Sequence, residues 1–264
     1  MARTILVLHG YAQNGFIFSK RIAALRKQCK GIDFGAANNS PSIRDLKDPS
    51  VFADGPVVLD PTDPFAPTKN HDGVRDPPLE DPMQDLRGWT EPWKVDGIDK
   101  SLAVLRDLVK GKHFDGIFGF SQGAAVAALF AAILEKPESY PDILVDGKPP
   151  HPPFEFCLAA SGYRLQDPRF DAVYGSGYAT PTLHLIGKAD NFVSSELTQS
   201  LVDISTNKRV EYHDGGHFVP SKTPWRKFLQ AYLTDHTTTA EAPKDEPAVS
   251  APASGTATPT TPTA

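Results

Sequence analysis

The sequence predicts an α/β fold in which a mostly parallel central sheet is flanked by helices. Two short runs, 5–8 and 154–162, are predominantly apolar, which is typical of strands buried on both faces of a sheet. The stretches 98–109 and 122–134 have the spacing and composition of helices, the first amphipathic and the second rich in alanine. Strands that alternate with helices along the chain favour a parallel sheet.

The segment 114–125 carries the strongest motif of the chain. Its apolar residues end at 119–123, Gly-Phe-Ser-Gln-Gly, and a helical run begins immediately afterwards. Gly-x-Ser-x-Gly between a strand and a helix is the pattern of a nucleophile elbow, where a strained turn exposes a serine. The two glycines leave room for that turn. We therefore expect Ser121 to be a nucleophile, with a non-catalytic serine in a glycine-rich turn as the alternative.

The first strand ends in a loop that begins with His9, Gly10 and Tyr11. In the α/β-hydrolase fold this loop supplies one donor of the oxyanion hole, and the residue after the nucleophile supplies the other. The backbone N–H groups of Tyr11 and Gln122 are therefore the candidate donors. We expect His9 to shape the loop rather than to act as a base, because it belongs to the His-Gly turn.

A serine hydroxyl needs a base to activate it, and the base needs an acid that orients it. In α/β-hydrolases the acid and then the histidine follow the serine, each on a loop after a strand. Asp190 follows the predicted strand 182–187, and His217 follows the predicted strand 209–213. Both lie at the carboxyl edge of the sheet, where open α/β sheets bind ligands. The sequence thus predicts a catalytic triad of Ser121, Asp190 and His217.

Other residues compete for the roles of base and acid. His213 ends a strand, whereas His217 follows two glycines that allow its ring to turn inward. Asp203 lies in a helical run, and Asp214 lies on the same turn as the base, so both are weaker candidates for the acid. His184 lies among apolar neighbours in the middle of a strand, and we expect it to be a core histidine.

The substrate pocket is expected beneath a proline-rich insertion, 61–92, that has no helical or alternating period. The insertion follows a short strand at 57–60 and precedes the nucleophile, so we interpret it as a cap. A second proline-rich insertion, 137–153, is expected to shape the same pocket. Aromatic side chains of the cap either line an acyl cavity or anchor the cap, and two more aromatics lie beside the acid and base. These candidates are Phe65, Trp89, Trp93, Phe192 and Phe218.

Composition excludes several classes of function. The 264 residues, 40% of them hydrophobic, suffice for one substantial α/β domain. A net charge of −5 without a basic block argues against a nucleic-acid partner. No metal-ligand spacing, phosphate-binding loop or dinucleotide fingerprint occurs, so no cofactor is expected. No segment has the length of a membrane span, and two cysteines fit a reducing compartment, so we expect a cytoplasmic protein without a membrane partner.

The sequence divides into two parts at residue 233. Residues 1–233 contain all the strands, helices and motifs described above, and we assign them to one hydrolase domain. From residue 234 the composition changes to Thr, Ala, Pro, Ser and charged residues, which cannot build a core. This composition predicts a disordered tail over residues 234–264.

Several motifs together resemble the FSH family of serine hydrolases, which is known from fungi and includes animal esterases. The resemblance covers about residues 1–233 and rests on the segments 9–14, 87–89, 114–124, 187–190 and 215–220. It implies that Ser121, Asp190 and His217 form the triad, and that the protein hydrolyses carboxylic esters in the cytoplasm or the nucleus. The motif at 119–123 is also similar to that of acyl-protein thioesterases, whereas Trp89 and the insertion at 61–92 favour the FSH type.

The expected reaction is hydrolysis of a small-molecule acyl ester of small or medium size through an acyl-enzyme. Two alternatives remain open. A thioesterase would release an acyl or polyketide chain from an acyl-carrier protein or coenzyme A, and some fungal members of the family release polyketide acids from carrier-protein thioesters. A non-catalytic binding module would use the same pocket as a receptor.

Overall fold

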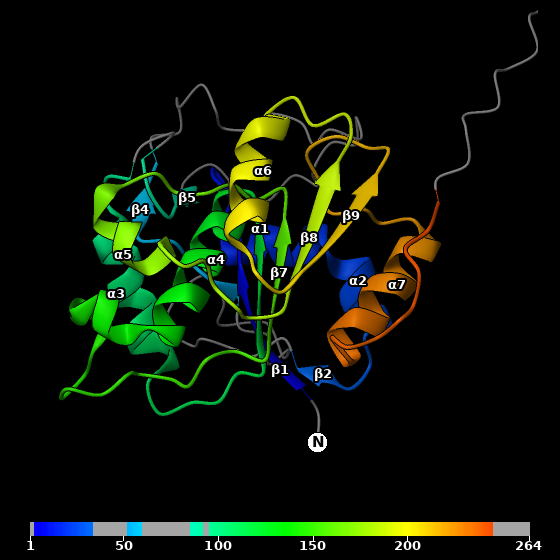
Figure 1. The fold of residues 1–264 in the computed structure, drawn as a ribbon. Coiled ribbons are helices and arrows are strands. Elements are labelled where there is room, and N and C mark those ends of the chain that lie inside the picture. The colour runs from blue at the N-terminus through cyan, green and yellow to red at the C-terminus, as the bar shows by residue number, and fades with distance from the viewer. Residues whose placement is uncertain (1–2, 34–51, 60–84, 92–94, 245–264) are drawn as a thin grey trace, which may run out of the picture.

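The computed structural model describes residues 3–33, 52–59, 85–91 and 95–244. Within these residues the main sheet has seven strands, and every strand pair in it is parallel. Figure 1 shows this sheet at the centre of the molecule, between layers of helices. The order along the sheet is β2 (Ile32–Asp33), β1 (Arg3–Leu8), β6 (Gly116–Phe120), β7 (Phe156–Ala160), β8 (Thr182–Gly187) and β9 (Lys208–His213), and β3 (Phe52–Ala53) also pairs with β1. The predicted α/β architecture is confirmed.

Helices cover the two faces of the sheet, which we call the α4 face and the α7 face. The α4 face carries α3 (Ile98–Val109), α4 (Gln122–Glu135), α5 (Asp171–Tyr174) and α6 (Ser195–Ile204). The α7 face carries α1 (Gly15–Arg21), α2 (Ala23–Gln28) and α7 (Thr223–Thr234). Among the described residues, the connections contain three short 3-10 helices, η2 (Pro137–Ser139), η3 (Pro141–Ile143) and η4 (Pro168–Phe170).

The helix α4 is the most buried helix of the α4 face. All of its residues from Gln122 to Leu134 are buried, and most of them are alanine or other small apolar residues. A helix that is apolar all round is covered on every side. Its small side chains allow α4 to pack closely on β6 and β7. The N-terminus of α4 lies directly at the end of β6, because only Ser121 separates the two elements.

The parallel register brings the loops after β6, β8 and β9 to one edge of the sheet. Phe120 at the end of β6 pairs with Ala160, and Gly187 at the end of β8 pairs with His213 at the end of β9. The loops that contain Ser121, Asp190 and His217 therefore start from this edge.

The expected strand at 57–60 lies outside the main sheet. In the structure β4 (Val57–Val58) pairs antiparallel with β5 (Arg87–Gly88) in a separate two-stranded ribbon. Most of the expected cap, residues 60–84 and 92–94 with Phe65 and Trp93, lies outside the described residues. Only the segment 85–91 of that cap is described by the structure.

The expected disordered tail is wrong for residues 234–244, which pack against the domain. The guanidinium group of Arg209 on β9 donates hydrogen bonds to the carbonyl oxygens of Thr238 and Ala240, at 3.0 and 2.6 Å. The ring of His236 stacks on Phe156, with the ring centroids 5.5 Å apart. Composition did not predict these contacts, because the carbonyl groups that Arg209 binds are present in any sequence and the stacking of His236 depends on Phe156, a residue distant in the chain. Residues 245–264 lie outside the described residues.

Two further observations bear on the expectations from composition. None of the helices in the described ranges is long and apolar enough to cross a membrane. Cys29 and Cys157 are both buried and form no disulfide, and burial raises the pKa of each thiol to about 12.

Candidate active site

The turn at Ser121 has the geometry that its glycines predicted. Ser121 has φ 55° and ψ −122°, a left-handed backbone conformation that is costly for a residue with a side chain. A Cβ atom on Gly119 would collide with the carbonyl oxygen of Gly123, and one on Gly123 would collide with that of His9. The backbone N–H of Ser121 donates to Ala160 on β7, at 2.8 Å. Close packing around the turn thus holds the strained serine in place.

The structure brings Ser121, Asp190 and His217 into one hydrogen-bonded chain. His217 Nδ1 lies 2.7 Å from Asp190 Oδ2, and His217 Nε2 lies 2.8 Å from Ser121 Oγ. The side chains of His217 and Asp190 are 12% and 5% exposed. Because the Asp190 carboxylate accepts a hydrogen bond from Nδ1–H, Nε2 is the ring nitrogen that can accept the proton of the serine hydroxyl.

The carboxylate of Asp190 is fixed on its other side by the backbone. Its Oδ1 accepts hydrogen bonds from the N–H groups of Phe192 and Val193, at 2.9 and 3.0 Å. Burial alone raises the pKa of Asp190, but the hydrogen bonds from His217 and from the two N–H groups outweigh burial and hold that pKa below its ordinary value. Asp190 is therefore ionised at neutral pH and holds the histidine ring in one orientation.

The loops that carry Asp190 and His217 are tied to each other. The N–H of Lys188 donates to the carbonyl oxygen of His213 at 2.8 Å, and that of Ala189 donates to the carbonyl oxygen of Gly215 at 3.0 Å. A Cβ atom on Gly187 would collide with the carbonyl oxygen of Gly216, so the two loops pack in backbone contact. Their relative position is set by these contacts.

The residues that competed for these roles are engaged elsewhere. His213 is buried beside the rings of Phe218 and Trp225, at centroid distances of 5.2 and 5.9 Å. Asp203 accepts a hydrogen bond from Gln199 on α6, and Asp214 forms an ion pair with Lys188. His184 is buried in the sheet, as expected of a core histidine.

The two aromatic residues beside the acid and base differ in their surroundings. Phe192 packs on His217, with the ring centroids 5.4 Å apart, and its side chain is 49% exposed. Phe218 packs on His213 instead. Phe192 is thus placed where a bound molecule can touch it, while a pocket role for Phe218 stays a prediction.

Gln122 fastens the segment 88–91 to the turn at Ser121. Its Oε1 accepts a 2.7 Å hydrogen bond from the backbone N–H of Trp89, and its Nε2 donates to the carbonyl and hydroxyl oxygens of Thr90. Gln122 is also the first residue of α4, and the N–H groups of a first helical turn have no intrahelical acceptor. That geometry is suited to binding a developing negative charge.

The loop after β1 is held by His9, which shapes it. His9 Nδ1 donates to the carbonyl oxygen of Gly10 at 2.7 Å, and Nε2 accepts from the N–H of Gly55 at 2.9 Å. Burial lowers the pKa of His9, in accord with this neutral form. Tyr11 follows in the same loop, and its ring lies against Gly88. Roles for the N–H groups of Tyr11 and Gln122 in an oxyanion hole stay predictions.

Trp89 anchors its segment and does not line an open pocket. Its side chain has no exposed surface, its indole N–H donates to the carbonyl oxygen of His9 at 2.9 Å, and its own carbonyl oxygen accepts from the hydroxyl of Ser101. The expectation that Trp89 contributes to the acyl pocket is therefore wrong, because the indole fills space between three elements. The anchoring alternative describes this residue correctly.

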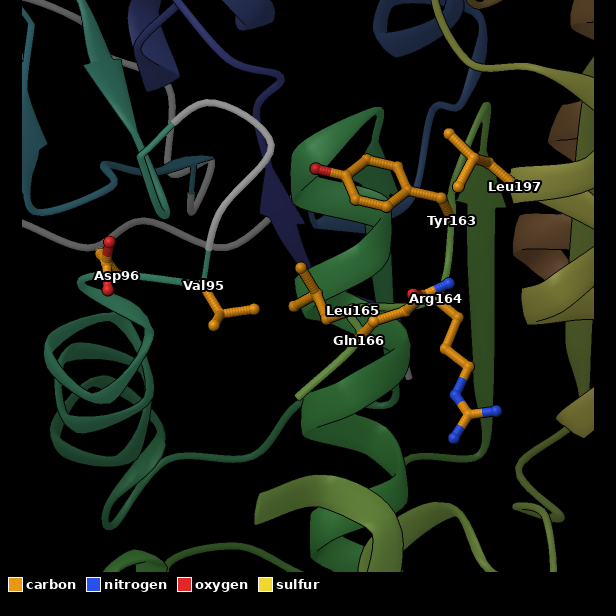
Figure 2. Close-up of a pocket in the computed structure, with 7 residues that line it drawn as sticks. All are labelled: Val95, Asp96, Tyr163, Arg164, Leu165, Gln166 and Leu197. Atoms are coloured by element: carbon orange, nitrogen blue, oxygen red, sulfur yellow. The ribbon is translucent and has the colours of Figure 1, made fainter. Parts of the chain in front are cut away.

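A cavity of about 410 Å³ lies beside α4 and involves none of the predicted pocket residues (Figure 2). Val95, Tyr163, Leu165 and Leu197 supply its apolar lining, and Asp96, Arg164 and Gln166 supply polar groups. Its volume falls within the range of small-molecule sites. Tyr163 belongs to a stretch after β7 that is rich in aromatic residues, and this was the one sequence signal for the cavity.

Residues 1–229 match the protein family described as Serine hydrolase (FSH1). Two proteins of Schizosaccharomyces pombe, a dihydrofolate reductase and an uncharacterized hydrolase, are 29% and 31% identical over 87% and 82% of this chain. The matches cover 46% and 47% of those proteins, so the chain spans about half their length. Esterase OVCA2 of Xenopus tropicalis is 30% identical over 87% of this chain and 93% of that protein.

The fold also resembles solved structures. A carboxylesterase from Mesorhizobium loti superimposes with a TM-score of 0.53 at 14% identity, covering 89% of this chain and 90% of that chain. At this identity the likeness concerns the fold alone. The α/β-hydrolase fold predicted from the sequence is confirmed.

Proposed function

Because the chain belongs to the FSH1 family of serine hydrolases, we propose that it hydrolyses carboxylic esters through an acyl-enzyme on Ser121. The observation that carries this proposal is the hydrogen-bonded chain from Asp190 through His217 to the hydroxyl of Ser121, with distances of 2.7 and 2.8 Å. Nucleophile, base and orienting acid are within the reach that such chemistry requires.

In the first half of the reaction, Ser121 Oγ attacks the carbonyl carbon of the ester while His217 Nε2 takes the hydroxyl proton. The ionised Asp190 stabilises the imidazolium that forms and keeps Nδ1 protonated. Collapse of the tetrahedral intermediate expels the alcohol, which receives its proton from His217 Nε2. The acyl group remains on Ser121 as an ester.

In the second half, water takes the place of the alcohol. His217 Nε2 removes a proton from the water as it attacks the acyl-enzyme, and the same proton returns to Ser121 Oγ when the acid product leaves. Each half passes through an oxyanion. The N–H groups of Gln122 and Tyr11 are the proposed donors to it, and losing one such donor typically lowers kcat by about 10²–10³.

The proposal is tested by incubating the intact chain with a 4-nitrophenyl ester and measuring the mass of the protein by mass spectrometry during turnover. We expect one added acyl group, located on Ser121 by peptide mapping, and none in Ser121→Ala. Matched oxygen esters and acyl thioesters of coenzyme A then measure which leaving group is preferred. Binding of esters without turnover or covalent intermediate would support a receptor instead.

A further inference from the structure

One wall of the cavity beside α4 follows, along the chain, from the strand β7 that contacts Ser121. The N–H of Ser121 donates to Ala160 at the end of β7, and the chain continues from Ala160 into the cavity wall at Tyr163. Between them, a Cβ atom on Gly162 would lie 3.0 Å from the side chain of Ala124 in the first turn of α4. The wall segment therefore runs from the serine along the start of α4.

The cavity and His217 lie toward opposite faces of the sheet. Leu165 belongs to the core of the α4 face, and Val95 and Tyr163 pack against that core. His217 instead packs on Phe120, with ring centroids 4.9 Å apart, and Phe120 belongs to the core of the α7 face. Ser121 stands between the two, at the junction of β6 and α4.

This arrangement decides which part of an ester faces the cavity. The alcohol must leave beside His217, because that histidine supplies its proton. The acyl part extends away from the leaving group, and therefore toward the α4 face. Building on the proposed function, we infer that the cavity is the acyl-binding subsite and that Leu197 and Leu165 set the length of an apolar acyl chain.

The chemistry of the lining fits an unbranched apolar chain. Figure 2 shows Leu165 and Val95 facing one another, with the ring of Tyr163 above Leu165 and the side chain of Leu197 beside Tyr163, farther from Val95. The polar groups come from Asp96, Arg164 and Gln166. A chain that fills the apolar part gains burial with each methylene, and one that reaches the polar groups gains no more.

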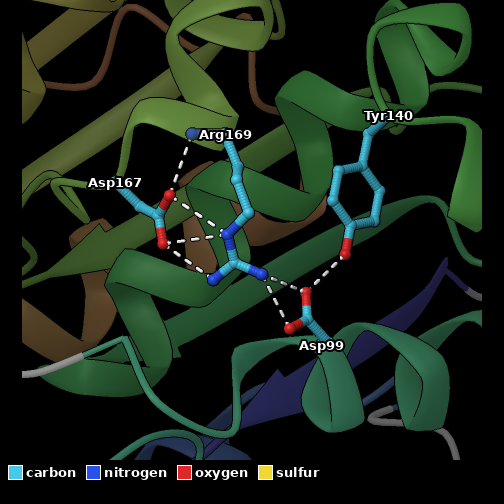
Figure 3. A network of polar contacts seen from close by, with 4 residues as sticks. All are labelled: Asp99, Tyr140, Asp167 and Arg169. Carbon is cyan, nitrogen blue, oxygen red and sulfur yellow. Dashed lines mark hydrogen bonds and ion pairs between the residues drawn. The ribbon is translucent and has the colours of Figure 1, made fainter.

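An ion-pair network connects the segments that follow the two walls (Figure 3). Arg169 donates to both oxygens of Asp99 at 2.8 and 2.7 Å, and also pairs with Asp167 at 2.7 Å. Asp99 lies just after the wall at 95–96, and Asp167 follows the wall at 163–166. The hydroxyl of Tyr140 donates to Asp99 at 2.8 Å and adds a third element. The network thus links the two segments of the chain that line opposite sides of the cavity.

The test measures kcat/KM for 4-nitrophenyl acetate and octanoate with the intact chain and two variants at Leu197, a half-buried residue of α6. Leu197→Trp fills the cavity, and we expect the octanoate-to-acetate ratio to fall about tenfold or more, since single methylenes in apolar pockets change kcat/KM by roughly that factor. Leu197→Ala enlarges the cavity. With 4-nitrophenyl laurate as a third substrate, it is expected to raise the kcat/KM for laurate relative to that for octanoate. Val104→Trp, on the exposed side of α3, is the matched control and leaves both ratios unchanged.

The outcomes separate the inference from the function on which it rests. If the intact chain hydrolyses esters but both Leu197 variants, folded by circular dichroism, keep the wild-type ratios, the inference is wrong and the proposed function stands. If the intact chain hydrolyses no ester and forms no acyl-enzyme, the proposed function fails, and the inference fails with it. If Leu197→Trp does not fold, Leu197→Ala decides alone.

Discussion

The side-chain oxygen of Gln122 accepts a 2.7 Å hydrogen bond from the backbone N–H of Trp89. The same amide donates to two oxygens of Thr90, and Gln122, Trp89 and Thr90 are all buried. The residue next to the candidate nucleophile therefore holds a segment more than thirty positions away in the chain. Its side chain couples the turn at Ser121 to the loop after β1, because Trp89 also donates to His9.

Gln122→Leu is predicted to destabilise the protein by about 2–5 kcal/mol, because it leaves the N–H of Trp89 and the carbonyl oxygen of Thr90 buried without the partner that Gln122 provides. Urea unfolding measures this loss. Gln199→Leu is the matched control, since Gln199 is an exposed glutamine with one hydrogen bond to Asp203. It is expected to change stability by at most about 0.5 kcal/mol. Equal effects of the two substitutions would contradict a fastening role for Gln122.

Asp190→Asn is predicted to lower kcat by about 10³–10⁴ with little change in KM. An amide at this position can donate to Nδ1, which favours the wrong tautomer of His217 and removes the charge that stabilises the imidazolium. Steady-state kinetics with a short acyl ester measures the change. Asp214→Asn, on the turn that precedes His217, is the control and is expected to keep wild-type activity. A larger loss of kcat in Asp214→Asn than in Asp190→Asn would identify Asp214 as the acid instead.

Much of the candidate site follows from local sequence patterns. The motif at 119–123 predicted the turn at Ser121 because steric crowding there admits only glycine on either side. Asp190 and His217 followed from the position of each loop after a strand, since parallel strands end at one edge of the sheet. The chemical types of these residues and their order in the chain were enough to predict that they meet.

Other features depend on contacts between distant segments, which no local pattern encodes. Trp89 is buried because His9 and Ser101 offer hydrogen-bond partners to it from two other elements. The cavity combines side chains from residues 95–96, the loop after β7 and α6. Residues 234–244 are held by Arg209 through backbone carbonyl groups, which have no signature in the amino-acid composition.

The buried His184 is predicted to make folding stability depend on pH. Burial, and then the nearby charge of Lys208, lower the pKa of His184 to about 4, and its Nε2 has no hydrogen-bond partner among the described residues. In the unfolded chain the pKa of a histidine is about 6.5. The unfolded state therefore binds more protons between these values, and stability is lost as pH falls from about 6.5 toward 4.

The loss attributable to His184 is of the order of 3 kcal/mol over that interval. Urea unfolding at several pH values measures it as the difference between the wild type and His184→Leu, which lacks the titrating group. If the free energy of unfolding depends on pH in the same way in the wild type and in His184→Leu, the prediction is wrong.

The proposed mechanism depends on Ser121 as a nucleophile that His217 activates. It is tested most directly by labelling the intact chain with a fluorophosphonate, which reacts covalently with activated serines, beside Ser121→Ala and His217→Ala. We predict one stoichiometric label on Ser121 in the intact chain, none in Ser121→Ala and a strongly slowed reaction in His217→Ala. An intact chain that takes up no label, or a label that persists in Ser121→Ala, would contradict the account.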